Sequence, residues 1–147
     1  MLTRIIRVCA LLCGTLVAAP VVHAQETEFK VVVNASNPVV SMRKTELSRL
    51  FLRKVTTWAD GQQVALVEPP ESAPTRRTFC KSVHGRELGS IQSYWQGMIF
   101  SGRAVPPVQK NDDAEVLAFV GTNRNALGYV SADAPLPAGV KAVALEQ

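Results

Sequence analysis

Histidine and cysteine are scarce in this sequence. Its 147 residues contain two histidines and three cysteines, and only His84 and Cys80 lie beyond residue 24. These two side chains and scattered carboxylates form no recognisable metal-ligand spacing, and a lone cysteine cannot form an intramolecular disulfide. No G-x-S-x-G motif or Gly-rich phosphate loop is present. We therefore expect no catalytic residue, no metal, no cofactor and no enzymatic activity.

A strong excess of charge of one sign is also missing. The formal net charge is +4, and Arg4 and Arg7 supply two of these charges within the first 24 residues. The rest of the chain is only mildly basic, and it has no Lys/Arg cluster long enough to follow a phosphate backbone. Nucleic acid is therefore excluded as the expected partner.

The one long apolar run lies at the N-terminus. Two arginines precede an apolar run over residues 8–22, which ends at Val22-His23-Ala24 with a small residue before the expected cut. This order is that of a secretory signal peptide. We expect residues 1–24 to be removed, leaving one domain over 25–147 in the periplasm.

Two other interpretations of this segment are weaker. A membrane-spanning helix needs about 20 apolar residues, whereas this run is shorter and contains Pro20 near its end. A lipoprotein would carry its anchor on Cys13, but Leu12 stands where a small residue is required. Cleavage after Ala24 is the better explanation.

Short β-branched runs alternate with amphipathic segments in the rest of the chain. The patterns predict strands at 29–33, 64–67, 127–130 and 140–145, and helices at about 44–53, 74–84, 88–100 and 113–121. Pro74 suits the first turn of its helix, and Gly85 ends it. Strands that alternate with helices predict an α/β fold, with a mainly parallel central sheet flanked by helices on both faces.

One segment has residues suited to anion binding. Ser72, Thr75 and Arg76 lie where a strand ends and the helix at Pro74 begins. Free backbone N–H groups, hydroxyls and a guanidinium at such a point can hold an oxyanion. An ordinary helix start with solvated arginines explains the same pattern, so both interpretations stay open.

A polar loop follows the first strand. Ser36 and Asn37 lie within residues 34–38, and we expect them at the carboxyl end of the sheet, where open α/β folds bind ligands. A simple polar turn is the structural alternative. His84 stands at a helix end before Gly85, where we expect a solvated side chain favoured by the helix dipole.

Four blocks of the chain resemble the periplasmic phosphate-binding proteins of ABC transporters, a type II periplasmic-binding-protein family. The resemblance lies in Val31-Val32-Val33-Asn34 through Val39, in Glu46-Leu47…Leu50-Phe51…Trp58-Ala59-Asp60-Gly61, in Thr75-Arg76…Phe79, and in Ala126-Leu127-Gly128-Tyr129-Val130. It implies a single lobe of that fold. It also implies that the segment around Thr75 corresponds to the family's anion-binding S-G-T-R turn.

The chain departs from the family pattern at this turn. When Thr75 is aligned with the family threonine, Ala73 replaces the serine, Pro74 the glycine and Pro69 an arginine. One hydroxyl, one backbone N–H and one cation are lost. Family members also close two lobes on the ligand, whereas 25–147 matches one lobe.

The resemblance leads to two functional hypotheses. The first is a non-enzymatic periplasmic solute-binding-like protein that takes phosphate or another small oxyanion at Ser72, Thr75 and Arg76, with Ser36 and Asn37 as weaker contacts. The second is an interaction module that has lost ligand binding and docks a membrane transporter, a sensor domain or a second copy of itself. Under the first hypothesis, Arg76→Ala is expected to weaken anion binding and to leave the fold intact.

Overall fold

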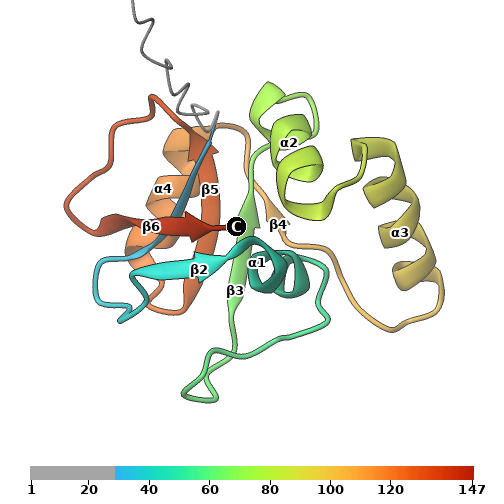
Figure 1. Cartoon of the computed structure of the whole chain (residues 1–147), viewed down its shortest axis with the longest axis horizontal. Coiled ribbons are helices and arrows are strands. Elements are labelled where there is room, and N and C mark those ends of the chain that lie inside the picture. The colour runs from blue at the N-terminus through green and yellow to red at the C-terminus, as the bar shows by residue number, and fades with distance from the viewer. Residues whose placement is uncertain (1–28) are drawn as a thin grey trace, which may run out of the picture.

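The computed structural model describes residues 29–147. The predicted signal peptide and its cleavage site lie outside these residues and remain predictions. Figure 1 shows the elements, which in chain order are β1 (Phe29–Asn34), β2 (Ser41–Arg43), α1 (Lys44–Phe51), β3 (Ala65–Glu68), α2 (Pro74–Phe79), η1 (Cys80–His84), α3 (Leu88–Phe100), β4 (Val108–Gln109), α4 (Asp113–Thr122), β5 (Ala126–Ser131) and β6 (Val140–Glu146). No helix within 29–147 is long and apolar enough to cross a membrane.

The six strands form one sheet in the order β2-β6-β1-β5-β3-β4. Three pairings are parallel, namely β2 with β6, β5 with β3, and β3 with β4. Strand β1 runs antiparallel to both of its neighbours, β5 and β6. The fold is therefore the expected α/β fold, and the sheet is mixed because β1 is reversed.

The predicted helices and the four predicted strands are present with small changes at their ends. The short strands β2 and β4 were not predicted. They have three and two residues, too few for a period-two pattern to appear in the sequence. Both lie at the edges of the sheet.

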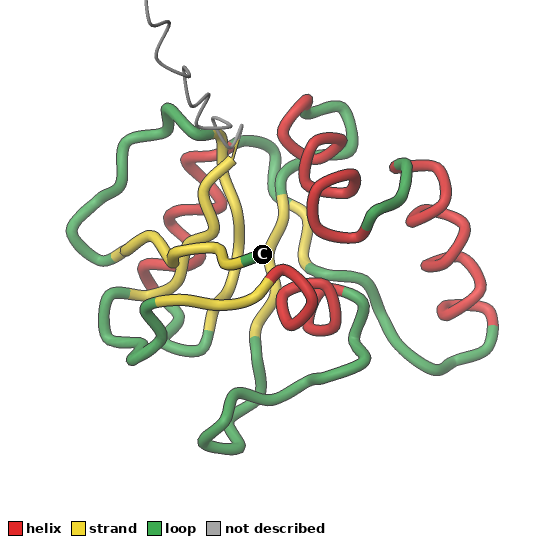
Figure 2. Tube along the Cα trace, in the orientation of Figure 1, coloured by secondary structure: helices red, strands yellow, loops and turns green. Residues whose placement is uncertain are grey.

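Helices cover both faces of the sheet (Figure 2). Leu47, Leu50 and Phe51 of α1 pack with Phe79 and Val83 against one face. The other face is covered by α4 through Val116, Leu117 and Val120. Because both faces are buried, the central strands are apolar at nearly every position.

Helix α3 does not pack on the sheet. Its buried residues Ile91 and Trp95 form a separate cluster with Leu52 and Cys80, at the ends of α1 and α2. Figure 1 accordingly shows α3 on the flank of the molecule. This position leaves room between α3 and the edge strand β4, where a cavity lies.

Gly128 allows α4 and β3 to approach β5 closely. A Cβ atom at this position would lie 2.8 Å from Val67 Cγ1 and 3.1 Å from the Val67 carbonyl oxygen. We expect Gly128→Ala to destabilise the fold by roughly 1–3 kcal/mol, because the strand backbone cannot move away cheaply. Urea unfolding of the variant measures this change.

Gly97→Ala is the matched control. Gly97 lies in α3 and has open space around its Cβ position. Alanine favours a helix by about 1 kcal/mol relative to glycine, so the control is expected to be neutral or stabilising. Equal effects of the two substitutions would contradict the close approach at Gly128.

Candidate functional site

The candidate site lies where β3 and β5 end. These two strands are parallel neighbours, so their carboxyl ends, Glu68 and Ser131, are at the same end of the sheet. Helix α2 begins there as well, after the turn at residues 69–73. Open α/β sheets bind ligands at this kind of position.

The centre of the site is a buried ion pair between Glu68 and Arg76. Nη2 of Arg76 lies 2.7 Å from Oε1 of Glu68, and the two residues are 4 % and 6 % exposed. Nη1 of Arg76 donates to the Pro69 carbonyl oxygen at 3.0 Å and to Oε1 of Gln109 at 3.3 Å. The alternative interpretation, in which this arginine is solvated, is therefore wrong for Arg76, which is an internal part of the fold.

Burial dominates the electrostatics of Glu68. It raises the pKa of Glu68 to about 7, although the charge of Arg76 and the hydrogen bond from Tyr129 act in the opposite direction. Tyr129 is itself fully buried, and its hydroxyl donates to Oε2 of Glu68 at 3.4 Å. Burial thus moves the pKa of Glu68 well above the usual range of a carboxyl group.

Arg76 retains one unused hydrogen-bond donor. Its Nε is buried and has no partner among the described residues. The second carboxylate near Arg76 is that of Glu71, which is half-exposed and whose Oε1 lies 4.0 Å from Nη2 of Arg76. Buried donors in folded proteins are nearly always paired, so this atom marks an incompletely satisfied site.

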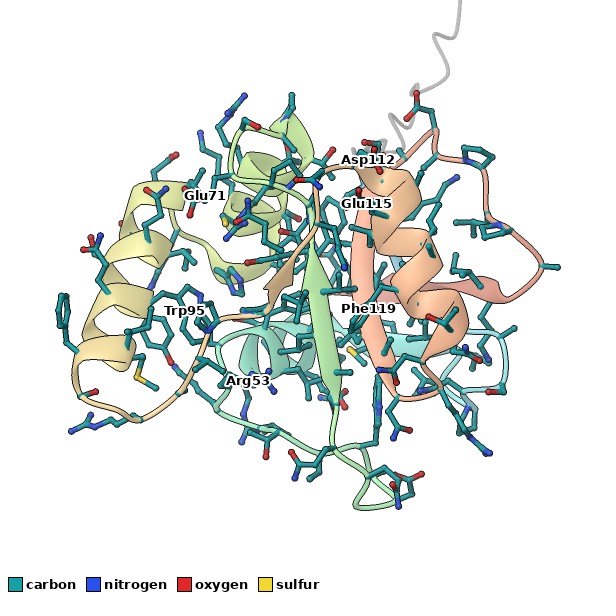
Figure 3. The ribbon with its side chains drawn as sticks, turned by 180° about the vertical axis from the view of Figure 1, so that it is seen from behind. Arg53, Glu71, Trp95, Asp112, Glu115 and Phe119 are labelled. Atoms are coloured by element: carbon teal, nitrogen blue, oxygen red, sulfur yellow. The ribbon has the colours of Figure 1, made fainter. Side chains whose placement is uncertain are left out.

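A cavity of about 310 Å³ opens beside the ion pair, between β3, β4 and α3. It is lined by Glu68, Arg76, Gln92 and Gln109, with Trp95 as an apolar wall. In Figure 3, Glu71 and Trp95 lie on the side of β3 that faces α3. The cavity combines one cation, carboxylates and amides, which are groups that bind small polar solutes.

A pair of hydroxyls forms the second part of the site. Oγ1 of Thr75 and Oγ of Ser131 are 2.9 Å apart, and Oδ2 of Asp113 accepts a hydrogen bond from the Ser131 backbone N–H at 3.2 Å. Thr75 is buried at the start of α2. Ser131 was not predicted, although its place directly after the apolar strand Leu127–Val130 puts it at a carboxyl end.

Ser72 lies three residues before Thr75, in the exposed turn before α2. The structure therefore brings three of the predicted residues, Ser72, Thr75 and Arg76, to one end of the sheet. Carboxylates are also plentiful there, since Asp112 and Glu115 lie at the start of α4 (Figure 3). Asp112 caps that helix by accepting from the Glu115 N–H at 2.8 Å.

The prediction that Ser36 and Asn37 share this end of the sheet is wrong. Strand β1 is antiparallel to β5, so the loop after Asn34 lies at the opposite end. Ser36 bonds to Oδ1 of Asn34 at 2.7 Å, and Oδ1 of Asn37 accepts from the Val39 N–H at 3.0 Å. These residues form a polar turn.

The expected solvation of His84 is also wrong. Its Nδ1 lies 2.8 Å from Oγ of Ser48, and burial, followed by the charges of Arg86 and Lys54, lowers the pKa of His84 to about 4. The imidazole is therefore neutral at pH 7.

Burial also raises the pKa of the Cys80 thiol to about 11, so Cys80 is an unreactive thiol. Within 29–147, no cluster of His, Cys, Asp or Glu could hold a metal ion.

Three solved structures that resemble this chain are described as phosphate-binding or phosphate-transport proteins. A candidate phosphate ABC transporter substrate-binding protein from Clostridium perfringens, with phosphate bound, matches 80 % of this chain at 19 % identity and a TM-score of 0.64, over 44 % of its own length. An ABC-type phosphate transport receptor from Vibrio cholerae matches 82 % at 24 % identity and a TM-score of 0.62, over 46 % of its length. A candidate phosphate-binding protein from Planctomyces limnophilus matches 82 % at 18 % identity and a TM-score of 0.60, over 42 %.

These likenesses confirm the resemblance at the level of the fold. The chain has the α/β fold of phosphate ABC transporter substrate-binding proteins, and it spans less than half the length of each of these three proteins. No protein-family model matches the chain, and no curated protein matches its sequence.

Proposed function

We propose that this chain is an exported, non-enzymatic solute-binding-like protein, a single-lobe relative of phosphate ABC transporter substrate-binding proteins. Its ligand is phosphate or another small oxyanion. Two observations carry the proposal: the hydroxyls of Thr75 and Ser131 form a pair, and the adjacent residue of α2, Arg76, places its guanidinium against Glu68, all at the carboxyl ends of β3 and β5. Two hydroxyls and a guanidinium are the groups that hydrogen-bond a tetrahedral oxyanion.

In this mechanism the protein replaces the hydration shell of the anion. The hydroxyls of Thr75 and Ser131 donate to its oxygens, Ser72 lies at the exposed edge of the site, and Arg76 supplies the positive charge. One lobe covers only one side of a ligand, so a second copy or a membrane transporter component would complete the enclosure. No step of this process requires a nucleophile or an acid/base pair, in keeping with the neutral His84 and the buried Cys80.

Isothermal calorimetry of the purified protein with phosphate tests the proposal. We expect one phosphate per chain, and we expect Thr75→Val or Ser131→Ala to weaken binding by about 10- to 100-fold, the loss of one hydrogen bond to a charged group. Ser36→Ala is the matched control, because Ser36 is a hydroxyl at the opposite end of the sheet. It should bind phosphate like the wild type.

Other outcomes of the titration are informative. Half a phosphate per chain would mean that two copies complete one site. Equal weakening by Ser131→Ala and Ser36→Ala would remove the site from the ends of β3 and β5. No heat with phosphate, sulfate or a small carboxylate between pH 5.5 and 8.5 would reject the proposal.

The second candidate function is a protein-interaction module without a small-molecule ligand. Exposed apolar side chains favour it: Ile99 and Phe100 at the end of α3, Val105 in the following loop, and Val108 on the edge strand β4. Such residues are typical of surfaces that contact other proteins. Under this hypothesis Phe100→Glu would reduce binding to a protein partner and leave anion titrations unchanged.

A further inference from the structure

The Glu68 carboxylate lies where an external anion would have to bind Arg76. Its Oε1 is 2.7 Å from Nη2, and the Pro69 carbonyl oxygen and the Gln109 amide occupy Nη1. Glu68 is therefore an internal competitor for the guanidinium. An oxyanion that binds Nη2 of Arg76 must displace this carboxylate.

Charge balance makes simple addition of an anion unfavourable. The ionised pair of Glu68 and Arg76 is neutral as a unit, so an added oxyanion would leave an uncompensated negative charge in a buried place. Above pH 7, protonation of Glu68 without an anion is also unfavourable, because it leaves the buried charge of Arg76 alone. Uptake of one proton cancels one negative charge of the anion, so a monovalent oxyanion leaves the charge of the site unchanged and sulfate adds one negative charge instead of two.

We propose that the cavity beside Glu68 and Arg76 is a proton-linked oxyanion site. A tetrahedral oxyanion replaces the Glu68 carboxylate on Arg76, and Glu68 takes up one proton from solvent. No covalent bond forms or breaks in the ligand. The inference rests on the proposed function and adds the residue that regulates it.

Three observations support the exchange. The cavity of about 310 Å³ can hold a small oxyanion, and the amides of Gln92 and Gln109 line it. The buried Nε of Arg76 lacks a partner among the described residues, so the guanidinium has a donor for the anion in addition to the Nη2 that Glu68 would release. The Tyr129 hydroxyl, 3.4 Å from Oε2, can remain bonded to the protonated carboxyl group.

The groups around Glu68 set the pH at which the exchange occurs. Four ionisable side chains interact with Glu68: Arg76 on α2, Tyr129 on β5, Glu71 in the turn between β3 and α2, and Cys80 on η1. Burial is the largest influence and raises the pKa of Glu68 to about 7. In the range above pH 7, oxyanion affinity should therefore increase about tenfold for each unit by which the pH is lowered. Below pH 7 the affinity should become constant.

Sulfate is the appropriate probe, because its own charge does not change between pH 5.5 and 8.5. We expect calorimetry of the purified protein to show a dissociation constant that decreases about tenfold from pH 8.5 to 7.5 and becomes nearly constant below pH 6.5. At pH 8, the heat should depend on the ionisation enthalpy of the buffer, as one proton taken up per sulfate requires. A pH-independent dissociation constant would overturn the exchange.

Two variants locate the proton on Glu68. Glu68→Gln should bind sulfate equally at all these pH values, and about as tightly as the wild type at pH 5.5. Glu71→Gln is the matched control, since Glu71 is half-exposed and 4.0 Å from Arg76, and it should keep the pH dependence. If Glu68→Gln does not fold, the wild-type pH series and proton count decide alone.

The outcomes separate this inference from the proposed function. If Thr75→Val weakens phosphate binding but the dissociation constant of sulfate does not change with pH, the inference is overturned and the proposed function is kept. Absence of both phosphate and sulfate binding at every pH would overturn both. If Glu68→Gln keeps the pH dependence of sulfate binding, the proton belongs to another group and the inference is also overturned.

Discussion

Glu68→Ala is expected to destabilise the protein by about 3–5 kcal/mol at pH 8, because it leaves a buried guanidinium without its counter-charge. The loss should be larger at pH 5, because the raised pKa of Glu68 makes its protonated form stabilise the wild-type fold at low pH. Arg76 is only 4 % exposed, and its Nη2 loses the carboxylate at 2.7 Å. An arginine side chain does not lose its proton in this range. The uncompensated charge in the variant therefore cannot be neutralised by a change in pH.

Arg76→Ala is expected to behave differently, because Glu68 can take up a proton. Loss of Arg76 removes the charge that lowers the pKa of Glu68, so this pKa rises further above 7. A raised folded-state pKa favours the fold at low pH and loses that contribution as the pH rises. The variant should therefore become more stable, relative to the wild type, as the pH falls from 8 to 5.

Urea unfolding of both variants at pH 5 and pH 8 measures this asymmetry. The double variant Glu68→Leu with Arg76→Met should recover most of the loss, because well-packed apolar side chains often replace a buried ion pair at little cost. Arg77→Ala, at an exposed position on the same helix, should change little. Equal and pH-independent losses for the two single variants would contradict this account.

The burial of Arg76 also changes the meaning of a binding experiment. From the sequence, Arg76→Ala was expected to remove an anion contact and to leave the fold intact. The contacts of Arg76 with Glu68 and Pro69 make it a structural residue as well. Thr75→Val and Ser131→Ala are better tests of the site, because they remove single hydroxyls without removing a buried charge.

The sequence was sufficient to predict the helices and central strands. Ile91 and Trp95 have the spacing of a helix from 88 to 100, and both are buried on one side of α3. The direction of β1 could not be predicted, because a run such as Val31–Val33 has the same pattern in either direction. That direction decided the place of Ser36 and Asn37, and so this part of the site prediction failed.

The remaining site residues were missed for a different reason. Glu68 is a single carboxylate after an apolar strand and before Pro69-Pro70, and such residues are usually solvated. Its partner lies on the next helix, and Gln109 comes from β4, a strand of two residues. Only the three-dimensional arrangement shows that these residues enclose Arg76.

Phe79→Ala is expected to cost about 3–5 kcal/mol, because Phe79 is the centre of the aromatic core. Its ring stacks on Tyr129 with centroids 3.7 Å apart and an interplanar angle of 4°. The rings of Phe29 and Phe51 contact it edge-on at 5.4 Å and 5.0 Å. Truncation would leave a cavity between α1, α2 and the sheet.

Phe100→Ala is the matched control, since the same side chain is 89 % exposed at the end of α3. It should change the free energy of unfolding by less than about 0.5 kcal/mol. Urea unfolding of both variants at pH 7 provides the comparison, and similar losses would contradict the central place of Phe79.

Because Tyr129 lies between Phe79 and Glu68, a cavity at Phe79 would also loosen the hydroxyl that bonds to Glu68. The aromatic core therefore supports the fold and the ion pair at the end of the sheet together.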